Sequence, residues 1–202
     1  MAMSHLTRSA AILAGGQAMR FGGRDKSALL VDGRTILDRQ IAVLMPITDD
    51  LMIVGHGHVT RGGAPRSVTD IVPGCGPLGG LHAALTAARG DALFLVACDM
   101  PYLTTGFVEY LFSLAQGADA VVPQSERGYH PLCAVYARAC LKPAAARLAD
   151  RRLKMRELVE SVRTRVVPIE DIRRFGDPVR LLANVNTPAD YAGLEALQGH
   201  KL

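Results

Sequence analysis

Short apolar runs alternate with segments of helical periodicity along most of the chain. A continuous apolar run bounded by turn residues predicts a buried strand, whereas apolar residues three or four positions apart predict an amphipathic helix. The runs that predict strands lie at residues 10–13, 51–54, 66–68, 93–98, 120–122, 132–136 and 165–169. The segments that predict helices lie at residues 35–45, 79–88, 107–115, 142–149 and 189–197. The region after Lys154 has the least regular pattern.

This alternation predicts an α/β fold built on a mostly parallel sheet. Parallel strands need a crossover connection, usually a helix, between one strand and the next. In open sheets of this kind, ligands bind at the carboxyl ends of the strands, near a switch in strand order. The residues that directly follow each predicted strand are therefore the first candidates for a functional site.

The composition favours one domain with an aliphatic core. The chain has 202 residues, of which 49% are hydrophobic and only 5% are aromatic, and it contains no tryptophan. Helices packed on an aliphatic sheet suit this composition. No internal repeat or low-complexity linker divides the sequence. We therefore expect a single domain over residues 1–202, with a short disordered N-terminus over residues 1–8.

Charge and cysteine usage narrow the class of protein. The net charge is +4, and no aromatic residues interleave with the basic groups as a surface for single-stranded nucleic acid would require. We expect no nucleic-acid partner, although a modest positive excess attracts a polyanionic small molecule. The four cysteines lack zinc-site spacing, and Cys98 and Cys133 lie in apolar runs where small core residues are expected. No apolar run approaches the roughly 18 residues that span a bilayer, so we expect a reduced cytoplasmic protein without a signal peptide or membrane anchor.

The first predicted strand leads into a glycine-rich segment, LAGGQAMRFGGRDK, at residues 13–26. Its glycines let the backbone approach an anion so that successive N–H groups surround phosphate oxygens, and Arg20 and Lys26 supply cations for a triphosphate. The segment is not a Walker A loop, because Asp25 stands where a glycine would have to precede Lys26, and its paired glycines do not match GxGxxG. The alternative is a flexible connection, although such a connection needs no buried strand before it.

One carboxylate, Asp99, ends the most regular apolar run of the chain, in the sequence VACDMPYL. An aspartate at this point has three possible roles: a metal ligand, a helix cap or a turn former. Pro101 favours the turn. Mg²⁺ is typically held by one or two carboxylates together with substrate phosphates. Asp99 therefore suits a metal ion shared with a bound triphosphate.

Other segments give weaker signals. Asp70 precedes PGCGPLGGL at residues 73–81, whose glycines and prolines lead into a helix with an anion-favouring N-terminus. By itself, however, Asp70 would be a surface turn residue more often than a ligand. Late in the chain stand His130, in YHPL, and Asn184 and Asn186, in NVNTP. From the residues alone, these three have no assigned role.

Taken together, the motifs resemble those of the molybdenum cofactor guanylyltransferase family. LAGGxxxRxGGxDK, GPLGGL, CDMPYL, HPL and NVNTPADY occur in the family's order between Leu13 and Tyr191. The resemblance implies a three-layer Rossmann-like nucleotidyltransferase fold with helices on both faces of the sheet. It also implies GTP and Mg²⁺ as ligands and molybdopterin as acceptor, with GMP transferred to the acceptor's terminal phosphate and pyrophosphate released. Molybdenum-insertion proteins and apo-molybdoenzymes are further candidate partners.

The resemblance also implies roles for particular positions. The residues implied for nucleotide binding are Leu13, Ala14, Gly15, Gly16, Lys26, Asp70 and Asp99. Asp99 is implied as the Mg²⁺ ligand, and the catalytic residues are implied to be Arg20, Lys26 and Asp99. The positions implied for the acceptor are His130, Asn184 and Asn186. One position departs from the family: Gly55 stands where several relatives carry an asparagine that contacts the nucleotide.

Three alternative functions stay open. A cytidylyltransferase of the same cofactor is the nearest, but that branch resembles LAAG where this chain has LAGG, so Gly15 favours the larger purine. A sugar-phosphate nucleotidyltransferase is the second, although such chains are usually longer. The third belongs to a different class, a nucleotide-binding accessory protein of a molybdoenzyme that performs no catalysis. The presence of Arg20, Lys26 and Asp99 argues against that class.

Overall fold

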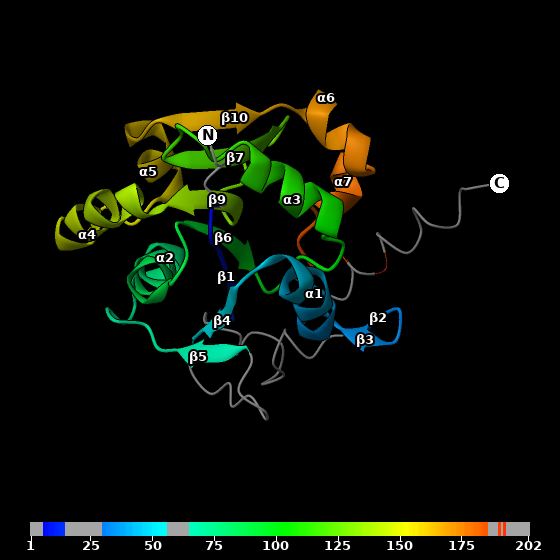
Figure 1. The fold of residues 1–202 in the computed structure, drawn as a ribbon, viewed down its shortest axis with the longest axis horizontal. Helices are drawn as coiled ribbons and strands as arrows, with labels where there is room; N and C mark the ends of the chain where they lie inside the picture. Colours follow the sequence, from blue (N-terminus) through cyan, green and yellow to red (C-terminus); the bar gives the residue numbers. More distant parts are fainter. Residues whose placement is uncertain (1–5, 15–29, 56–64, 186–189, 191, 193–202) are drawn as a thin grey trace.

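The structure is a computed structural model that describes residues 6–14, 30–55, 65–185, 190 and 192 (Figure 1). The strands of this part are β1 (Arg8–Leu13), β2 (Leu30–Val31), β3 (Arg34–Thr35), β4 (Asp50–Val54), β5 (Arg66–Val68), β6 (Ala92–Ala97), β7 (Ala120–Ser125), β8 (Gly128–Tyr129), β9 (Cys133–Ala137) and β10 (Thr164–Val167). The α-helices are α1 (Ile36–Leu44), α2 (Gly76–Ala87), α3 (Thr105–Ser113), α4 (Leu141–Ala149), α5 (Met155–Ser161), α6 (Ile169–Ile172) and α7 (Pro178–Leu181). Three 3₁₀ turns are η3 (Met45–Ile47), η4 (Arg138–Cys140) and η5 (Arg173–Phe175).

An eight-stranded sheet runs through the centre of the described chain in the order β10-β7-β9-β6-β1-β4-β5, with β8 paired to β7 (Figure 1). The pairs β1–β4, β1–β6, β4–β5 and β7–β10 are parallel, so the mostly parallel sheet is confirmed. Strand β9 runs antiparallel to both of its neighbours, β6 and β7. Only residues 126–132 separate β7 from β9, and a parallel connection needs a crossover of about a dozen residues or more.

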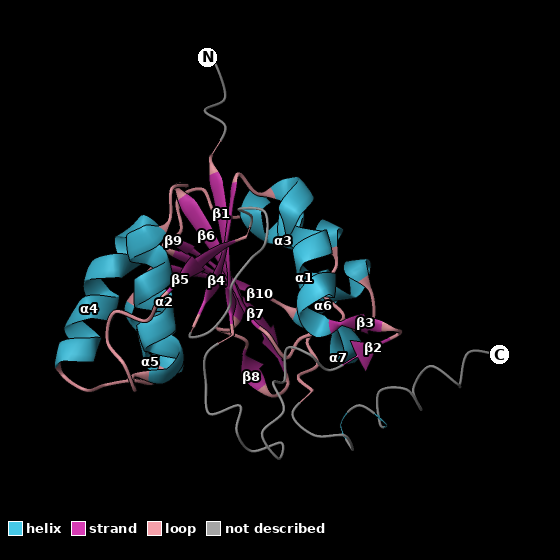
Figure 2. Cartoon of the chain, turned by 90° about the horizontal axis from the view of Figure 1, so that it is seen from below, coloured by secondary structure: helices cyan, strands magenta, loops and turns pink. Residues whose placement is uncertain are grey.

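Helices cover both faces of the sheet, which confirms the three-layer arrangement (Figure 2). Helices α2, α4 and α5 pack on one face, and α1, α3, α6 and α7 lie on the other. Strand β1 contributes to both cores in alternation: Ala11 and Leu13 face the first group of helices, and Ala10 and Ile12 face the second. A strand covered on both faces has no polar side. This is why the predicted strands are continuous apolar runs.

The observed elements differ from the predicted ones mainly at their ends. Helix α2 begins at Gly76 rather than Gly79, because Pro77 fits the first helical turn. Gly76 itself has a φ of 58°, a left-handed conformation that glycine adopts readily at the bend into the helix. The hairpin β2–β3 and the helices α5, α6 and α7 were not predicted, since they are too short or too irregular to show a period. The strand predicted at 165–169 ends at Val167. The helix predicted at 189–197 falls largely outside the described residues.

The start of β1 is tied to the start of β6. The backbone N–H and the hydroxyl of Thr7 both donate to Asp91 Oδ2, at 3.1 and 2.7 Å. Arg8 is already part of β1. Hydrogen bonds to Asp91 and Asp49, both distant in the sequence, hold Thr7 and Arg8 in place, so the disorder expected over residues 1–8 does not extend to these two residues. Residues 1–5 lie outside the described part.

The cysteines are all free thiols, as their spacing indicated. Cys133 is fully buried in β9, and burial raises the pKa of its thiol to about 12, so the core position expected for it is confirmed. Cys98 is only partly buried, because β6 ends at Ala97 and Cys98 opens the turn that follows. Its side chain still packs against the core beside α3.

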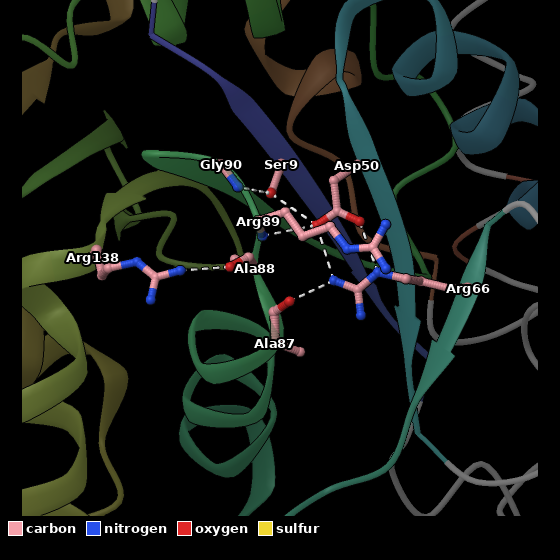
Figure 3. Close-up of polar contacts among 8 residues, drawn as sticks. All are labelled: Ser9, Asp50, Arg66, Ala87, Ala88, Arg89, Gly90 and Arg138. Atoms are coloured by element: carbon pink, nitrogen blue, oxygen red, sulfur yellow. Dashed lines mark hydrogen bonds and ion pairs between the residues drawn. The ribbon is translucent and has the colours of Figure 1, made fainter.

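A polar cluster joins β4, β5 and the C-terminal end of α2 at the amino-terminal edge of the sheet (Figure 3). Arg66 donates to both carboxylate oxygens of Asp50, and its Nη2 also donates to the Ala87 carbonyl at 2.6 Å. Arg138 Nη2 donates to the Ala88 carbonyl, also at 2.6 Å. Cations at a helix C-terminus satisfy its last carbonyls and offset its negative end. The cluster therefore anchors α2 from the edge opposite to the carboxyl ends of the strands.

Candidate functional site

The strand order reverses beside β1, because the chain passes from β1 to β4 and β5 on one side and then to β6 on the other. At the carboxyl ends of these strands, the Cys98 N–H donates to the Leu13 carbonyl at 3.1 Å. The Ala14 N–H donates to the Val54 carbonyl at 2.9 Å. The ends of β6, β1 and β4 thus form one continuous edge, and open α/β sheets bind their ligands at such a switch point. Leu13 and Ala14, two of the residues implied for the nucleotide, lie at its centre.

Asp99 lies at this edge, partly buried in the turn that follows β6. Its Oδ1 accepts a hydrogen bond from Asn184 Nδ2 at 3.3 Å, and its carbonyl accepts one from the Val185 N–H at 2.8 Å. Asn184 is 85 residues further along the chain. The structure therefore brings together two side chains that the sequence analysis had singled out separately.

Helix α1 holds the same turn from the side of the core. Gln40 Nε2 donates to the carbonyls of Ala97 and Met100, at 2.8 and 3.0 Å. Arg39 Nε donates to the Pro101 carbonyl at 3.1 Å. The sequence analysis missed both side chains. The signal that the sequence offered was Gln40, a polar residue within the apolar face of the helix predicted at residues 35–45.

Helix α2 lies directly against the end of β1. A Cβ at Gly80 would stand 2.8 Å from Leu13 Cδ2, closer than real Cβ contacts, so glycine is what lets the helix approach Leu13. Asp70 lies in the loop before α2, and its Oδ1 is buried with no hydrogen-bond partner among the described residues. Buried polar atoms normally have partners because an unpaired one costs free energy. Asp70 can therefore accept a hydrogen bond from a ligand.

Gly55 follows β4 at the same edge, where its N–H donates to the Val68 carbonyl at 3.0 Å. The residue is buried and has a φ of 141°, a backbone conformation that residues with side chains rarely adopt. An asparagine at this position would be strained on this backbone.

The antiparallel course of β9 brings His130 to this edge from the other side. The Ala97 N–H donates to the Leu132 carbonyl at 3.0 Å, so the start of β9 lies beside the end of β6. His130 lies in the connection that leads into β9, whereas Leu13, Ala14 and Asp99 lie at or just after the carboxyl ends of β1 and β6. It reaches the ligand edge only because β9 is reversed.

The His130 ring is fixed by Ser125 at the end of β7. Their Oγ and Nε2 atoms lie 2.7 Å apart, and Ser125 Oγ also accepts from the Arg127 N–H at 3.2 Å. Burial lowers the pKa of His130, and the charge of Arg127 lowers it further. The imidazole is therefore neutral near pH 7, when it offers one donor and one acceptor.

A cavity of about 750 Å³ opens between the end of β7 and the segments around α6 and α7. His130 and Asn184, two of the positions implied for the acceptor, both line it. The charged residues that line this cavity are of both signs: Arg127 and Arg173 stand beside the carboxylates of Glu126, Asp177 and Asp190. The exposed Val179 adds an apolar wall. Asn184 belongs both to the lining of this cavity and to the surroundings of Asp99, to which it donates a hydrogen bond.

The remaining predicted residues, Gly15, Gly16, Arg20, Lys26 and Asn186, lie outside the described part of the chain. Within that part, no three His, Cys, Asp or Glu side chains gather closely enough to hold a metal ion. A lone carboxylate such as Asp99 still fits a Mg²⁺ ion, because this ion usually takes one or two protein carboxylates and completes its ligands with substrate phosphates. None of the described helices is long and apolar enough to cross a bilayer.

Comparisons with known proteins agree with this arrangement. The model of the MobA-like NTP transferase domain matches residues 10–166. The molybdenum cofactor guanylyltransferase of Desulfosudis oleivorans is 32% identical over 187 residues, which cover 92% of this chain and 93% of that protein. The probable molybdenum cofactor guanylyltransferase of Pelotomaculum thermopropionicum is 34% identical over 189 residues, which cover 92% and 90%.

A solved structure shares the fold. The molybdopterin-guanine dinucleotide biosynthesis protein A from Archaeoglobus fulgidus has a TM-score of 0.78 at 22% identity, covering 95% of this chain and 98% of that one. The fold and the domain match together define a nucleotidyltransferase. The chain belongs to the MobA-like NTP transferase family, and the resemblance to molybdenum cofactor guanylyltransferases that its motifs indicated is confirmed.

Proposed function

We propose that this protein transfers GMP from GTP to the terminal phosphate of molybdopterin and releases pyrophosphate, with Mg²⁺ as its cofactor. The names of its relatives support these substrates. The observation that carries the proposal is the contact between Asn184 and Asp99. Asn184 lines the cavity beside His130 and Asp99 lies at the edge beside β1, so this contact links the two regions proposed for the two substrates.

The nucleotide side of the proposed site is the edge formed by β1, β4 and the loop before α2. The buried Oδ1 of Asp70 can accept from a base N–H or a ribose hydroxyl. Lys26 and Arg20 are proposed to offset the charge of the triphosphate. The residues proposed for the nucleotide are Leu13, Ala14, Gly15, Gly16, Lys26, Asp70 and Asp99.

The acceptor side is the cavity beside His130. Its volume of about 750 Å³ falls within the range of small-molecule sites, roughly 300–1,000 Å³. Arg127 and Arg173 are the cations of this cavity that can donate to the acceptor's phosphate, whereas the carboxylates of Glu126, Asp177 and Asp190 suit donor groups of the acceptor. A neutral His130 can hydrogen-bond without adding charge. Asn184 and Asn186 complete the residues that we propose for the acceptor. This side thus offers both cationic and carboxylate groups to a small polar ligand.

Asp99 is the residue that would hold the metal ion, together with oxygens of the triphosphate. Asn184 donates to its Oδ1 and so fixes the direction of the carboxylate. A bound Mg²⁺ would offset negative charge that develops on the phosphates during transfer. The single carboxylate therefore has a defined orientation toward the nucleotide edge.

The proposed transfer needs no general base. An oxygen of the acceptor phosphate, already ionised near pH 7, attacks the α-phosphorus of GTP and forms a new phosphoanhydride bond. The bond between the α-phosphorus and the bridging oxygen to the β-phosphate breaks, and its electron pair leaves with pyrophosphate. Catalysis of this kind comes from positioning the two phosphates and neutralising their charge. Arg20, Lys26 and Asp99 are proposed to act in both ways, by positioning the phosphates and by neutralising their charge.

We also propose a cytoplasmic location, with molybdenum-insertion proteins and apo-molybdoenzymes as further partners. A dinucleotide cofactor is of use only once it is handed to an apo-enzyme, which supports partners of this kind. The reduced thiols of the four cysteines agree with such a compartment.

Two measurements test the proposed function. Thermal shifts with Mg²⁺ and each nucleoside triphosphate should show greater stabilisation by GTP than by CTP, and a ligand at about 100 times its Kd adds roughly 2.7 kcal/mol. Pyrophosphate release should require GTP and molybdopterin together. An equal or larger shift with CTP would contradict the base assignment. No release with either triphosphate would favour the accessory protein that performs no catalysis.

A further inference from the structure

The turn that carries Asp99 is held by side chains of helix α1. Three backbone carbonyls of residues 97–101 accept hydrogen bonds from two consecutive residues, Arg39 and Gln40. We propose that Gln40 and Arg39 are positioning residues for the Asp99 carboxylate. This inference rests on the proposed function, since it assumes that Asp99 holds the metal ion.

Gln40 spans the turn on both sides of Asp99. One Nε2 group donates to the carbonyl of Ala97, before Asp99, and to that of Met100, after it. The side chain is only 1% exposed, so water does not compete for these carbonyls. Because both donor hydrogens are used on the same short turn, Gln40 fixes the distance between its two ends. The backbone at Asp99 is thereby set from the core side.

Arg39 links the same turn to the hairpin β2–β3. Its Nε donates to the Pro101 carbonyl, while its Nη1 donates to the Val31 carbonyl and to Asp32 Oδ2, each at 3.1 Å. The hairpin begins directly after the glycine-rich segment, whose Lys26 is proposed to bind phosphate. Arg39 therefore connects the exit of that segment to the turn of the proposed metal ligand.

A third contact completes the frame around Asp99. The Val185 N–H donates to the Asp99 carbonyl, beside the bond from Asn184 to the carboxylate itself. The turn is thus restrained from α1 and from residues 184–185, and Asn184 restrains the carboxylate itself. Hydrogen-bond partners that orient a metal ligand commonly change metal affinity or activity by about 10–100-fold when removed. Gln40 and Arg39 act one step further out, through the backbone that carries the ligand.

The test compares Gln40→Met and Arg39→Met with wild type in three measurements. The first is the Kd for Mn²⁺ in the presence of a non-hydrolysable GTP analogue, read from the electron paramagnetic resonance signal of free Mn²⁺. The second is kcat at saturating GTP, together with the Mg²⁺ concentration that gives half-maximal rate. The third is Tm. Methionine keeps about the length of Gln40 and the apolar stem of Arg39 but donates no hydrogen bond. We expect about tenfold weakening of Mn²⁺ binding, the low end of that range, because both side chains act through the backbone; the Mg²⁺ requirement should rise to match.

Two matched controls lie at the opposite edge of the sheet. Ser9→Ala removes a buried hydroxyl that makes two hydrogen bonds, to Asp50 and from the Gly90 N–H. Arg138→Met removes an arginine bond to the Ala88 carbonyl. Both variants should lower Tm while leaving the Mn²⁺ Kd and the Mg²⁺ requirement within twofold of wild type. A structural role alone would make the α1 variants behave like these controls.

The outcomes separate the two proposals. If both α1 variants bind Mn²⁺ like wild type, the positioning role is overturned whatever happens to Tm. If Gln40→Met does not fold, Arg39→Met decides by the same measure, because its side chain is a quarter exposed. An Asp99→Asn variant that binds Mn²⁺ like wild type would overturn the positioning role and the metal site together. A wild-type protein that binds Mn²⁺ but releases no pyrophosphate would overturn the proposed function alone, and the Mn²⁺ comparison would still decide the role of α1.

Discussion

Arg66 binds Asp50 through two parallel hydrogen bonds, with Nε 2.7 Å from Oδ1 and Nη2 2.9 Å from Oδ2 (Figure 3). Asp50 also accepts from Ser9 Oγ and from the Arg89 N–H, and its side chain is 4% exposed. The carboxylate therefore ties together β1, β4, β5 and the connection after α2. A buried carboxylate of this kind stabilises the fold only while it is ionised and paired.

Removing the cation of this pair should destabilise the protein without affecting the proposed site. Breaking a buried ion pair costs about 3–5 kcal/mol, and we expect Arg66→Met to fall near 3 kcal/mol because Asp50 keeps its other donors. Denaturant unfolding measures the loss. Turnover per folded molecule should stay within twofold of wild type. A large loss of turnover in a well-folded variant would show that the cluster reaches the ligand edge.

The same carboxylate predicts a dependence of stability on pH. Burial by itself raises the pKa of Asp50, but hydrogen bonds from Arg66, Arg89 and Ser9 outweigh it and hold the pKa below its ordinary value of 3.8. A lowered pKa in the folded state contributes stability above the unfolded value, and that stability is lost as pH falls through the folded pKa. Below about pH 4, the free energy of unfolding should therefore fall less steeply with decreasing pH for Arg66→Met than for wild type. Parallel slopes would contradict this role of the pair.

Asp99→Asn should abolish GMP transfer and leave the fold intact. The change removes one negative charge with almost no change in volume, and the carbonyl of residue 99 still accepts from the Val185 N–H. If Asp99 serves only the turn, activity persists and only stability falls. Rate and Tm measured on the same sample distinguish the two roles.

Gly80→Ala should weaken GTP binding more than it lowers stability. The new Cβ would stand 2.8 Å from Leu13 Cδ2, the far end of a flexible side chain, so Leu13 shifts rather than α2. Because Leu13 is proposed to contact the nucleotide, we expect KM for GTP to rise severalfold. Gly106→Ala in α3 is the control, since its Cβ would meet Phe175 at an ordinary 3.7 Å. An unchanged KM would remove Leu13 from the nucleotide side.

Lys26→Ala should reduce turnover more than it weakens GTP binding. A cation aimed at groups that become more negative in the transition state acts on the rate. Removing one such preorganised group typically costs about 10²–10³ in rate. Lys26→Arg should restore little of the lost turnover, because the broad planar guanidinium group of arginine replaces the compact ammonium group of lysine. Steady-state kinetics at saturating GTP decide; a variant within threefold of wild type would leave the glycine-rich segment without its proposed cation.

Gly55→Asn should not restore the contact that relatives make at this position. At a φ of 141°, a residue with a side chain costs about 1–3 kcal/mol in backbone strain. We therefore expect a lower Tm and no tighter binding of GTP. Calorimetric titration of the variant with GTP and Mg²⁺ measures the second quantity. Tighter binding would mean that the backbone at Gly55 adapts to the side chain.

Local patterns in the sequence determined most of the secondary structure and the fold class. Runs such as residues 51–54 and 93–98 are apolar throughout because helices cover both faces of the sheet. Burial of these strands on both faces can therefore be predicted from the local sequence. The motifs after β1 and β6 pointed to the ligand edge because parallel strands end together there. That part of the site follows from the order of elements alone.

Only the tertiary structure decided which distant residues meet at that edge. The reversal of β9 brings His130 beside the end of β6, and no local period records the direction in which a strand pairs. Gln40 was overlooked because a polar residue between buried apolar ones gains meaning only when its partners, the carbonyls of Ala97 and Met100, are known. The contact between Asn184 and Asp99 likewise spans 85 residues. Hydrogen bonds over such separations depend on how the layers pack, which local sequence does not encode.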